Sequence, residues 1–535
     1  MSESDPYDYL IIGAGSAGCV LANRLSTDGR TRVLLLEAGP RDSNPWIHVP
    51  IGYGKLFAMP GVNWAYQSEP EPELGGRRVF TPRGKVLGGS SSINGLVYIR
   101  GAHNDFDEWA RLGNSGWSFA DCLPYFKRAE DQCRGADQWH GVGGPLGVSD
   151  LPDKHPLADA FIDACAEIGV PRNDDFNGAR QDGAGYYQAT MRNSRRSSAA
   201  VAYLRPAQTR PNLRVVTDAL VTRIRFHGTR AVGVEYVTKS GAVSARAQRE
   251  VLLCGGAFNS PQVLELSGVG DRGRLEALGI PVVHDAPGVG AGLQDHFYVK
   301  TVWQCTQPIT FNDDMRSLRR KLGIGWRYLV QRRGPLAVSA GYAGAFVSTR
   351  AALPSPDVQL YFINFSTDKM GTGLHPFSGF SASMSPLRPE SRGHVHIRSA
   401  DPHAAPAIQY NYLATEGDRA TAIAGMQFLR RIMQAPAMQP YVAAEYAPGA
   451  RVTNDADWLA YCREAGATVY HPTSTCRMGP DQLAVVDERL RVRGLTALRV
   501  VDASVMPNVV SGNTNAATIM LAEKAADLIA ADARA

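Results

Sequence analysis

A glycine-rich turn near the start of the chain limits its fold more than any other feature. Gly13, Gly15 and Gly18 form the pattern G-x-G-x-x-G, which follows a short apolar run and opens an alanine- and leucine-rich segment. A second apolar run, residues 33–36, ends at Glu37. Strand, turn, helix, strand and acid in this order predict a dinucleotide-binding βαβ unit. Glu37 is placed to accept hydrogen bonds from a ribose, which favours FAD or NAD over NADP.

The residues of this turn have separate physical tasks. Gly13 permits the tight turn, Gly15 lets the backbone approach a pyrophosphate, and Gly18 lets helix and strand pack closely. Ser16 and Ala17 begin the helix, whose unpaired N–H groups attract the pyrophosphate. We therefore expect all five residues to contribute to cofactor binding.

Length and charge limit the class of protein. A chain of 535 residues suggests two or more domains, and its 44% hydrophobic and 20% charged residues are ordinary for a globular protein. The net charge of +5 is small for this length, and the basic residues form no long tract. We expect no nucleic-acid partner.

Cysteine use and hydropathy bear on location. The eight cysteines are scattered without a C-x-x-C pair, which favours reduced thiols over disulfides or a zinc site. No metal is expected, because His394 and His396 share a strand face without a third ligand and are interpreted as a solvated pair. The first strand starts close to Met1, and no run of 18 apolar residues occurs, so we expect neither a signal peptide nor a membrane span. The expected location is the cytoplasm, with peripheral association with the inner membrane left open.

Periodicity along the rest of the chain changes several times. Residues 39–84 are rich in proline and glycine and indicate a long insertion or lid. Residues 213–255 predict successive strands, and residues 516–530 predict a final helix. Residues 301–450 contain alternating strands, including DVQLYFINF and GHVHIRS, that predict a separate antiparallel sheet.

These patterns predict an α/β fold. A discontinuous Rossmann-like cofactor-binding domain would receive an inserted α+β substrate domain built on an antiparallel sheet, with the small-molecule site in the cleft between them. The cofactor domain is expected to comprise residues 1–155, 201–300 and 451–535. The substrate domain is expected to comprise residues 156–200 and 301–450.

Four further segments carry chemistry. They are a Gly/Ser-rich loop, a strand-to-helix turn, a His-Pro segment and a C-terminal Ser-Gly-Asn segment, at residues 84–101, 256–270, 470–479 and 501–516. Together with the first turn, these segments resemble the glucose–methanol–choline (GMC) family of FAD-dependent oxidoreductases from about residue 7 to residue 530. Within that family the chain looks most like the bacterial choline dehydrogenase and alkanol dehydrogenase branch. No G-x-S-x-G elbow occurs, which disfavours a serine hydrolase.

The resemblance implies a catalytic pair, His471 and Asn513. An alcohol is a weak acid, and hydride leaves its carbon readily only as the oxygen becomes an alkoxide. His471 can take that proton near neutral pH, and Asn513 can hold the oxygen without competing for the proton. The hydride would pass to N5 of the flavin.

The resemblance also implies the cofactor site. Some relatives tether FAD through a histidine at the position of Ile93, so this chain is expected to hold FAD non-covalently. Val86 and residues 94–97 match a loop against the flavin ring, and Val221 matches the position whose backbone reads the adenine. The remaining matched positions contact the ribityl chain, the pyrophosphate and the flavin. The full expected set beyond the first turn is Val86, Asn94, Gly95, Leu96, Val97, Val221, Asp502, Ala503, Asn513 and Thr514.

The substrate follows from two departures from the choline-oxidising relatives. Tyr342 stands where they carry a glutamate that pairs with the trimethylammonium, and Tyr361 stands where they carry a histidine. With Tyr470 these residues predict a neutral, aromatic pocket for a primary alcohol, which would be oxidised to an aldehyde. Two alternatives are choline oxidation and a hydroxynitrile-lyase-type reaction with a passive flavin. The sequence does not decide whether oxygen or a quinone is the electron acceptor.

Overall fold

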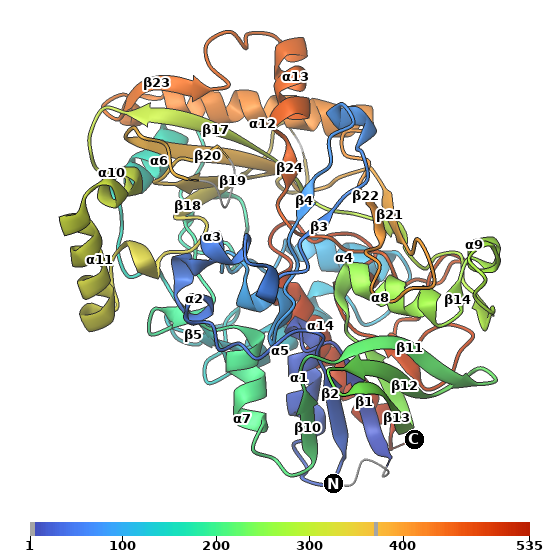
Figure 1. Cartoon of the computed structure of the whole chain (residues 1–535). Coiled ribbons are helices and arrows are strands. Elements are labelled where there is room, and N and C mark those ends of the chain that lie inside the picture. Colours follow the sequence, from blue (N-terminus) through green and yellow to red (C-terminus); the bar gives the residue numbers. More distant parts are fainter. Residues whose placement is uncertain (1–5, 352, 369–372, 535) are drawn as a thin grey trace.

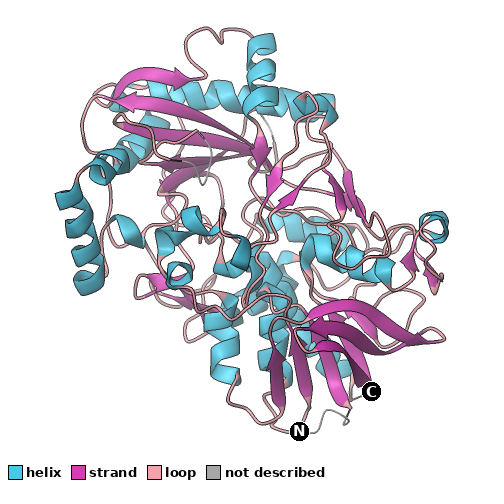
Figure 2. Cartoon of the chain, viewed as in Figure 1, coloured by secondary structure: helices cyan, strands magenta, loops and turns pink. Residues whose placement is uncertain are grey.

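The computed structural model describes residues 6–351, 353–368 and 373–534. Two large sheets, each with its own hydrophobic core, make up the molecule (Figure 1). Helices and loops surround and connect the two sheets (Figure 2). Among the described residues, no helix is both long and apolar enough to cross a membrane.

The first sheet is the predicted dinucleotide-binding sheet. Its parallel part has the order β10-β2-β1-β13-β25, and strands β1 and β2 are almost entirely apolar because both of their faces are buried. Helices α1 (Ser16–Leu25) and α14 (Asn515–Asp532) pack against each other beside it. The strands are β1 (Tyr7–Ile12), β2 (Val33–Leu36), β10 (Leu213–Val216), β13 (Gly241–Leu253) and β25 (Leu498–Val500). The first and last helices of the chain therefore meet in one domain, as the sequence predicts.

Strand β13 serves two pairings along its length. Its first half runs antiparallel to β12 (Arg230–Thr238), which pairs in turn with β11 (Leu220–His227). Its second half runs parallel to β1. The strands predicted in residues 213–255 are confirmed. Strands β11, β12 and β13 form an antiparallel meander that extends the first sheet on one side.

The second sheet is antiparallel, as predicted for the substrate domain, with the order β23-β17-β20-β19-β18-β7. Helices α6 (Pro156–Glu167) and α12 (Glu416–Gln434) pack against it. Its strands are β7 (Gly183–Tyr186), β17 (Phe297–Cys305), β18 (Ala343–Val347), β19 (Val358–Ile363), β20 (Gly379–Pro386) and β23 (Val442–Ala447). The short strand β24 (Ala467–Thr468) also pairs with β17. The exact domain boundaries stay a prediction.

One predicted strand belongs elsewhere. The segment GHVHIRS forms β21 (Gly393–His396), which pairs with β16 (Ala291–Leu293) and β22 (Ala407–Gln409) in a small separate sheet. The expectation of a solvated histidine pair is also wrong for His396. That side chain is buried, and its Nδ1 lies 2.7 Å from Oε1 of Glu265 on α8 (Gly256–Leu266), which holds β21 against the cofactor domain.

The proline-rich insertion after β2 packs between the two sheets. It forms the short helices α2 (Pro45–His48) and α3 (Tyr53–Leu56) and a small hairpin of β3 (Tyr66–Gln67) and β4 (Phe80–Thr81). Four of its aromatic residues, Tyr53, Phe57, Trp64 and Phe80, line the cavity described next.

Candidate active site

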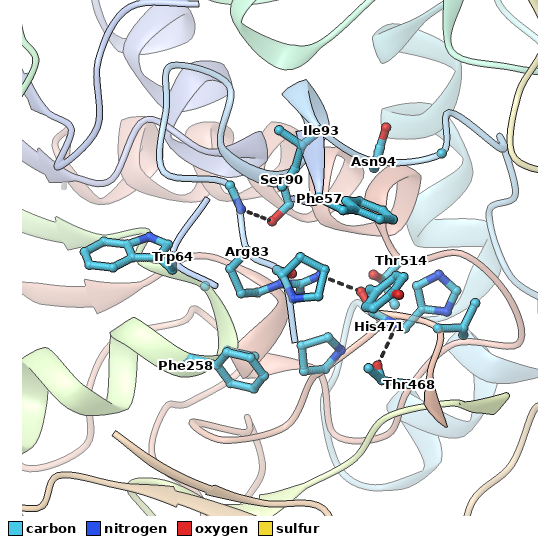
Figure 3. A pocket seen from close by; sticks show the side chains of 18 of the residues that line it. Phe57, Trp64, Arg83, Ser90, Ile93, Asn94, Phe258, Thr468, His471 and Thr514 are labelled. Atoms are coloured by element: carbon cyan, nitrogen blue, oxygen red, sulfur yellow. Dashed lines mark hydrogen bonds between the residues drawn. The ribbon is translucent and has the colours of Figure 1, made fainter. Parts of the chain in front are cut away.

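A cavity of about 930 Å³ extends from the glycine turn of the first sheet to residues of the second sheet. Figure 3 shows His471, Thr514 and Arg83 along this cavity, with Trp64 and Phe258 toward one end. Most residues expected to bind cofactor or substrate line it. They are Gly13, Gly15, Ser16, Ala17, Glu37, Asn94, Gly95, Leu96, Val97, Val221, Tyr361, Tyr470, His471, Asp502, Ala503, Asn513 and Thr514.

Three expected residues do not line the cavity. Gly18 packs against the backbone of Gly13, on the side of the turn away from the cavity. Val86 is buried in a small hydrophobic core together with residues of the insertion. Tyr342, expected in the substrate pocket, is packed in the second core, with its ring centroid 5.8 Å from that of His155. The expectation for Tyr342 is therefore wrong. Ala340, two residues before Tyr342, lines the cavity instead.

The glycine turn has the shape that a dinucleotide requires. Gly13 has a φ of 96°, and a Cβ there would lie 2.5 Å from the carbonyl oxygen of Cys254. A Cβ on Gly18 would lie 1.9 Å from the carbonyl oxygen of Gly13. By contrast, a Cβ on Gly15 would meet no protein atom within 4 Å. The space at Gly15 opens into the cavity at the start of α1, which fits the pyrophosphate of a dinucleotide.

Two buried carboxylates shape the backbone beside this space. The oxygens of Glu37 accept hydrogen bonds from the backbone N–H groups of Ala14 and Gly39, each at 2.9 Å. Burial raises the pKa of Glu37 to about 7. Asp502 accepts hydrogen bonds from the Ser260 hydroxyl (2.6 Å) and from the N–H of Gly256 (2.8 Å) at the start of α8. Each carboxylate therefore holds one turn of the cavity wall in place. The contacts of Glu37 and Asp502 with a cofactor stay a prediction.

A chain of hydrogen bonds fixes the protonation of His471. Nε2 of His296 lies 3.1 Å from the carbonyl oxygen of Leu387, and a carbonyl only accepts, so His296 Nε2 is the protonated nitrogen. Burial lowers the pKa of His296 to about 4 and keeps the ring neutral, which leaves its Nδ1 as an acceptor. His471 Nδ1 lies 2.9 Å from that atom and must donate. The remaining nitrogen of His471, Nε2, is therefore unprotonated and can only accept a hydrogen bond.

The lone pair of His471 Nε2 points to Asn513. Nδ2 of Asn513 lies 3.0 Å from it and donates. The other side of this amide faces Gln359, whose Nε2 donates to Asn513 Oδ1 at 3.4 Å. Gln359 in turn accepts a hydrogen bond from the Tyr361 hydroxyl at 2.8 Å. The catalytic pair expected from the sequence is thus in contact and held by neighbouring side chains.

The backbone around His471 is also constrained. Tyr470 has a φ of 72°, a conformation that costs a non-glycine residue free energy and is common at functional sites. Its carbonyl accepts a hydrogen bond from Arg83 at 2.7 Å. Asp295 accepts the backbone N–H of His471 at 2.6 Å and the Thr468 hydroxyl at 2.5 Å, and burial raises its pKa to about 6. These bonds fix the backbone that carries His471.

Burial lowers the pKa of His471 well below its ordinary value, and the nearby His296 ring and Arg83 guanidinium lower it further. A neutral imidazole with a free Nε2 is the form that a general base requires.

Several residues of the site were not identified from the sequence. Asp295 and His296 are adjacent polar residues immediately before β17, and a buried strand preceded by two titratable groups is a signal that could have marked them. Their proximity to His471, far along the chain, is not readable from spacing. Tyr298 and Lys300 follow on β17 and line the cavity, where burial lowers the pKa of Lys300 to about 8.

Comparisons with known proteins show the family of the chain. The profiles of the GMC oxidoreductase family match residues 7–298 and 389–522. The chain is 44% identical to mitochondrial choline dehydrogenase of Homo sapiens, over 99% of this chain and 90% of that protein. It is 43% identical to an alcohol dehydrogenase [acceptor] of Pseudomonas putida, over 98% of this chain and 95% of that protein.

Two solved structures have a similar fold. Pyridoxine 4-oxidase from Mesorbium loti superposes with a TM-score of 0.89 at 31% identity, covering 97% of this chain and 98% of that one. A fungal aryl-alcohol oxidase superposes with a TM-score of 0.86 at 25% identity, covering 99% and 100%. The fold and site define an α/β oxidoreductase with a dinucleotide-binding domain. The chain belongs to the GMC oxidoreductase family.

Proposed function

We propose that the chain is a FAD-dependent alcohol dehydrogenase or oxidase that converts a neutral primary alcohol to an aldehyde. The observation that carries this proposal is the unprotonated Nε2 of His471 beside Asn513, in the cavity that also contains the glycine turn. The names of the relatives, choline dehydrogenase and alcohol dehydrogenase [acceptor], support an alcohol as substrate.

The residues of the site explain how the alcohol is activated. An alcohol hydroxyl that replaces the hydrogen bond between Asn513 and His471 donates its proton to His471 Nε2 and accepts a hydrogen bond from Asn513 Nδ2. The proton moves to Nε2 as the negative charge grows on the substrate oxygen. His296 keeps His471 in the required tautomer through Nδ1. When bound, FAD supplies the hydride acceptor at N5.

The cofactor is proposed to be held non-covalently. Ile93 lines the cavity, and an aliphatic side chain cannot form the tether found at this position in some relatives. Gly15 and the start of α1 would take the pyrophosphate, while Glu37 would take the ribose hydroxyls through lone pairs that its two backbone bonds leave free.

The end of the cavity near β17 and β19 favours a neutral substrate. Tyr298 and Tyr361 give it aromatic walls, and Lys300 and Asp368 add one cation and one carboxylate that offset each other. Choline is the second candidate substrate, because the choline dehydrogenase relatives match over nearly the full chain. The acceptor is proposed to be oxygen or a quinone, and the location is proposed to be the cytoplasm, with peripheral association with the inner membrane left open.

Anaerobic reduction of the purified yellow holoenzyme tests this function. We expect benzyl alcohol and hexanol to bleach the visible absorbance of the flavin, with a higher second-order rate constant than choline. A hydroxynitrile-lyase-type protein would give no bleaching with any alcohol, and a choline enzyme would be bleached fastest by choline. Admission of air, or of a soluble quinone, to the bleached enzyme then identifies the acceptor by the return of colour. Denaturation in acid should release the flavin into the supernatant, and flavin that stays on the precipitate would contradict non-covalent binding.

A further inference from the structure

Helix α11 (Leu318–Gln331) carries an apolar face on the outside of the molecule. It lies at the periphery of the view in Figure 1, after the short helix α10 (Phe311–Arg316). Tyr328 is its one buried side chain and donates a hydrogen bond to the carbonyl of Ser194 at 3.0 Å. Half of the large apolar side chains exposed on the described residues belong to this helix: Leu318, Leu322, Trp326, Leu329 and Val330. Each of these five is more than half exposed.

The spacing of these side chains places them on one side of the helix. With about 100° of rotation per residue, the five positions cover an arc of about 120°. Tyr328 lies on the opposite side, against the body of the protein. Surface helices normally turn their apolar stripe toward the core, and a contiguous exposed stripe marks an interaction site.

Cations surround this apolar arc. The segment 318–333 contains six basic residues and no acidic one: Arg319, Arg320, Lys321, Arg327, Arg332 and Arg333. Arg327 and Arg333 reach Asp153 at 3.1 and 3.2 Å, which anchors the C-terminal half of the helix to the body. Within the described part of the chain, Arg319 and Lys321 have no carboxylate within ion-pair distance.

We propose that α11 is a docking helix for an anionic lipid bilayer, with its leucines and Trp326 inserted at the level of the head groups. A Leu/Trp face flanked by Arg and Lys on a surface helix is the pattern of interfacial helices. Anionic lipids supply the negative charge that Arg319 and Lys321 lack within the described part of the protein. A second copy fits this face poorly, because a two-fold pairing of α11 with itself would bring basic residues against basic residues, and Asp153 and Asp314 already pair with Arg320, Arg327 and Arg333 of their own chain.

Sedimentation of the holoenzyme with lipid vesicles tests the proposal. We expect binding to phosphatidylcholine vesicles that contain phosphatidylglycerol, weaker binding to pure phosphatidylcholine, and release by salt. The double variant Leu322→Gln/Trp326→Gln should bind at least tenfold more weakly. Arg319→Gln and Lys321→Gln should each weaken binding about fivefold at low salt.

Matched controls separate docking from a general change of surface. Val142→Gln and Leu483→Gln remove exposed apolar side chains elsewhere and should leave vesicle binding unchanged. All variants should keep the alcohol activity of the enzyme in solution, because none of these residues lines the cavity. Failure of the unmodified enzyme to bind anionic vesicles would overturn the proposal, as would equal binding by the α11 and control variants. A lipid-free dimer that Leu322→Gln/Trp326→Gln dissociates would show instead that a second copy covers the helix.

Discussion

Burial, the His296 ring and the Arg83 guanidinium all lower the pKa of the His471 imidazole. Its pKa lies well below the ordinary value of about 6.5, so the ring is neutral at and above neutral pH. A general base is inactive when it is protonated. Because the pKa of His471 is lowered, its protonation and the loss of activity occur only at acidic pH. We predict that the second-order rate constant for flavin reduction is constant around neutrality and falls only below about pH 6.5. A loss of rate that begins above this pH would contradict a neutral His471 as the base.

His296 acts on the reaction through His471. His296→Leu removes the acceptor for His471 Nδ1–H, so the free lone pair is no longer fixed at Nε2. One lost hydrogen bond predicts an about tenfold slower flavin reduction, with little change in the concentration of alcohol needed for half-saturation. His296→Asn keeps an acceptor near the position of Nδ1 and should recover most of the rate. Equal losses in both variants would indicate a packing role only, and stopped-flow absorbance measures both.

Only part of the site could be predicted at this scale. His471 and Asn513 lie in recognisable segments, and the structure places them 3.0 Å apart through Nε2 and Nδ2. Tyr342 was assigned to the wrong environment, because the direction of a side chain just before a strand depends on where that strand begins. His296 was missed because its role depends on a contact between distant segments.

At the scale of elements, two glycines of the same turn should respond differently to an added methyl group. Gly15→Ala places the methyl in open space inside the cavity, so the protein should fold but bind FAD more weakly. Gly18→Ala forces the methyl to 1.9 Å from the Gly13 carbonyl, so α1 must move from β1 and the folded protein itself should be destabilised. Thermal unfolding and flavin content after purification measure the two effects. Similar unfolding temperatures for the two variants would contradict this division of tasks.

Helices and strands with a clear apolar pattern could be predicted from the sequence, but the strands with which they pair could not. The βαβ unit and the strands of residues 213–255 follow from apolar runs and turns. Strand β21 shows the limit, because its alternation predicts a strand but its pairing with β16 and β22 depends on contacts far along the chain.

At the scale of the whole molecule, one buried carboxylate ties the two ends of the chain together. Glu523 on α14 binds Arg24 of α1 at 2.7 Å and Arg128 of α5 (Phe119–Ala129) at 2.9 Å. Glu523→Gln removes the charged partner of Arg24 and one of the two charged partners of Arg128, and should lower the free energy of unfolding by about 1.5–3 kcal/mol. Asp527→Asn is the control, because its pair with Arg128 is half exposed and should change stability by less than about 1 kcal/mol. Denaturant unfolding of the holoenzyme compares the two, and equal losses would contradict a special role for Glu523.

The discontinuous architecture was predictable because the first strand and the last helix both have the character of a cofactor domain. The way the two sheets enclose one cavity was not, since it depends on the packing of the insertion after β2 and of the loop before β17. These segments are irregular and carry no periodic signal.

The most direct test of the account is the rate of flavin reduction in His471→Ala under anaerobic conditions with saturating benzyl alcohol. We expect this variant to retain FAD and to be reduced about 10²–10⁴-fold more slowly than the unmodified enzyme. Asn513→Ala should retain FAD and lose less of the rate, because it removes hydrogen bonds and leaves the base in place. Reduction of His471→Ala at a rate near that of the unmodified enzyme would contradict the central claim that His471 removes the proton of the alcohol.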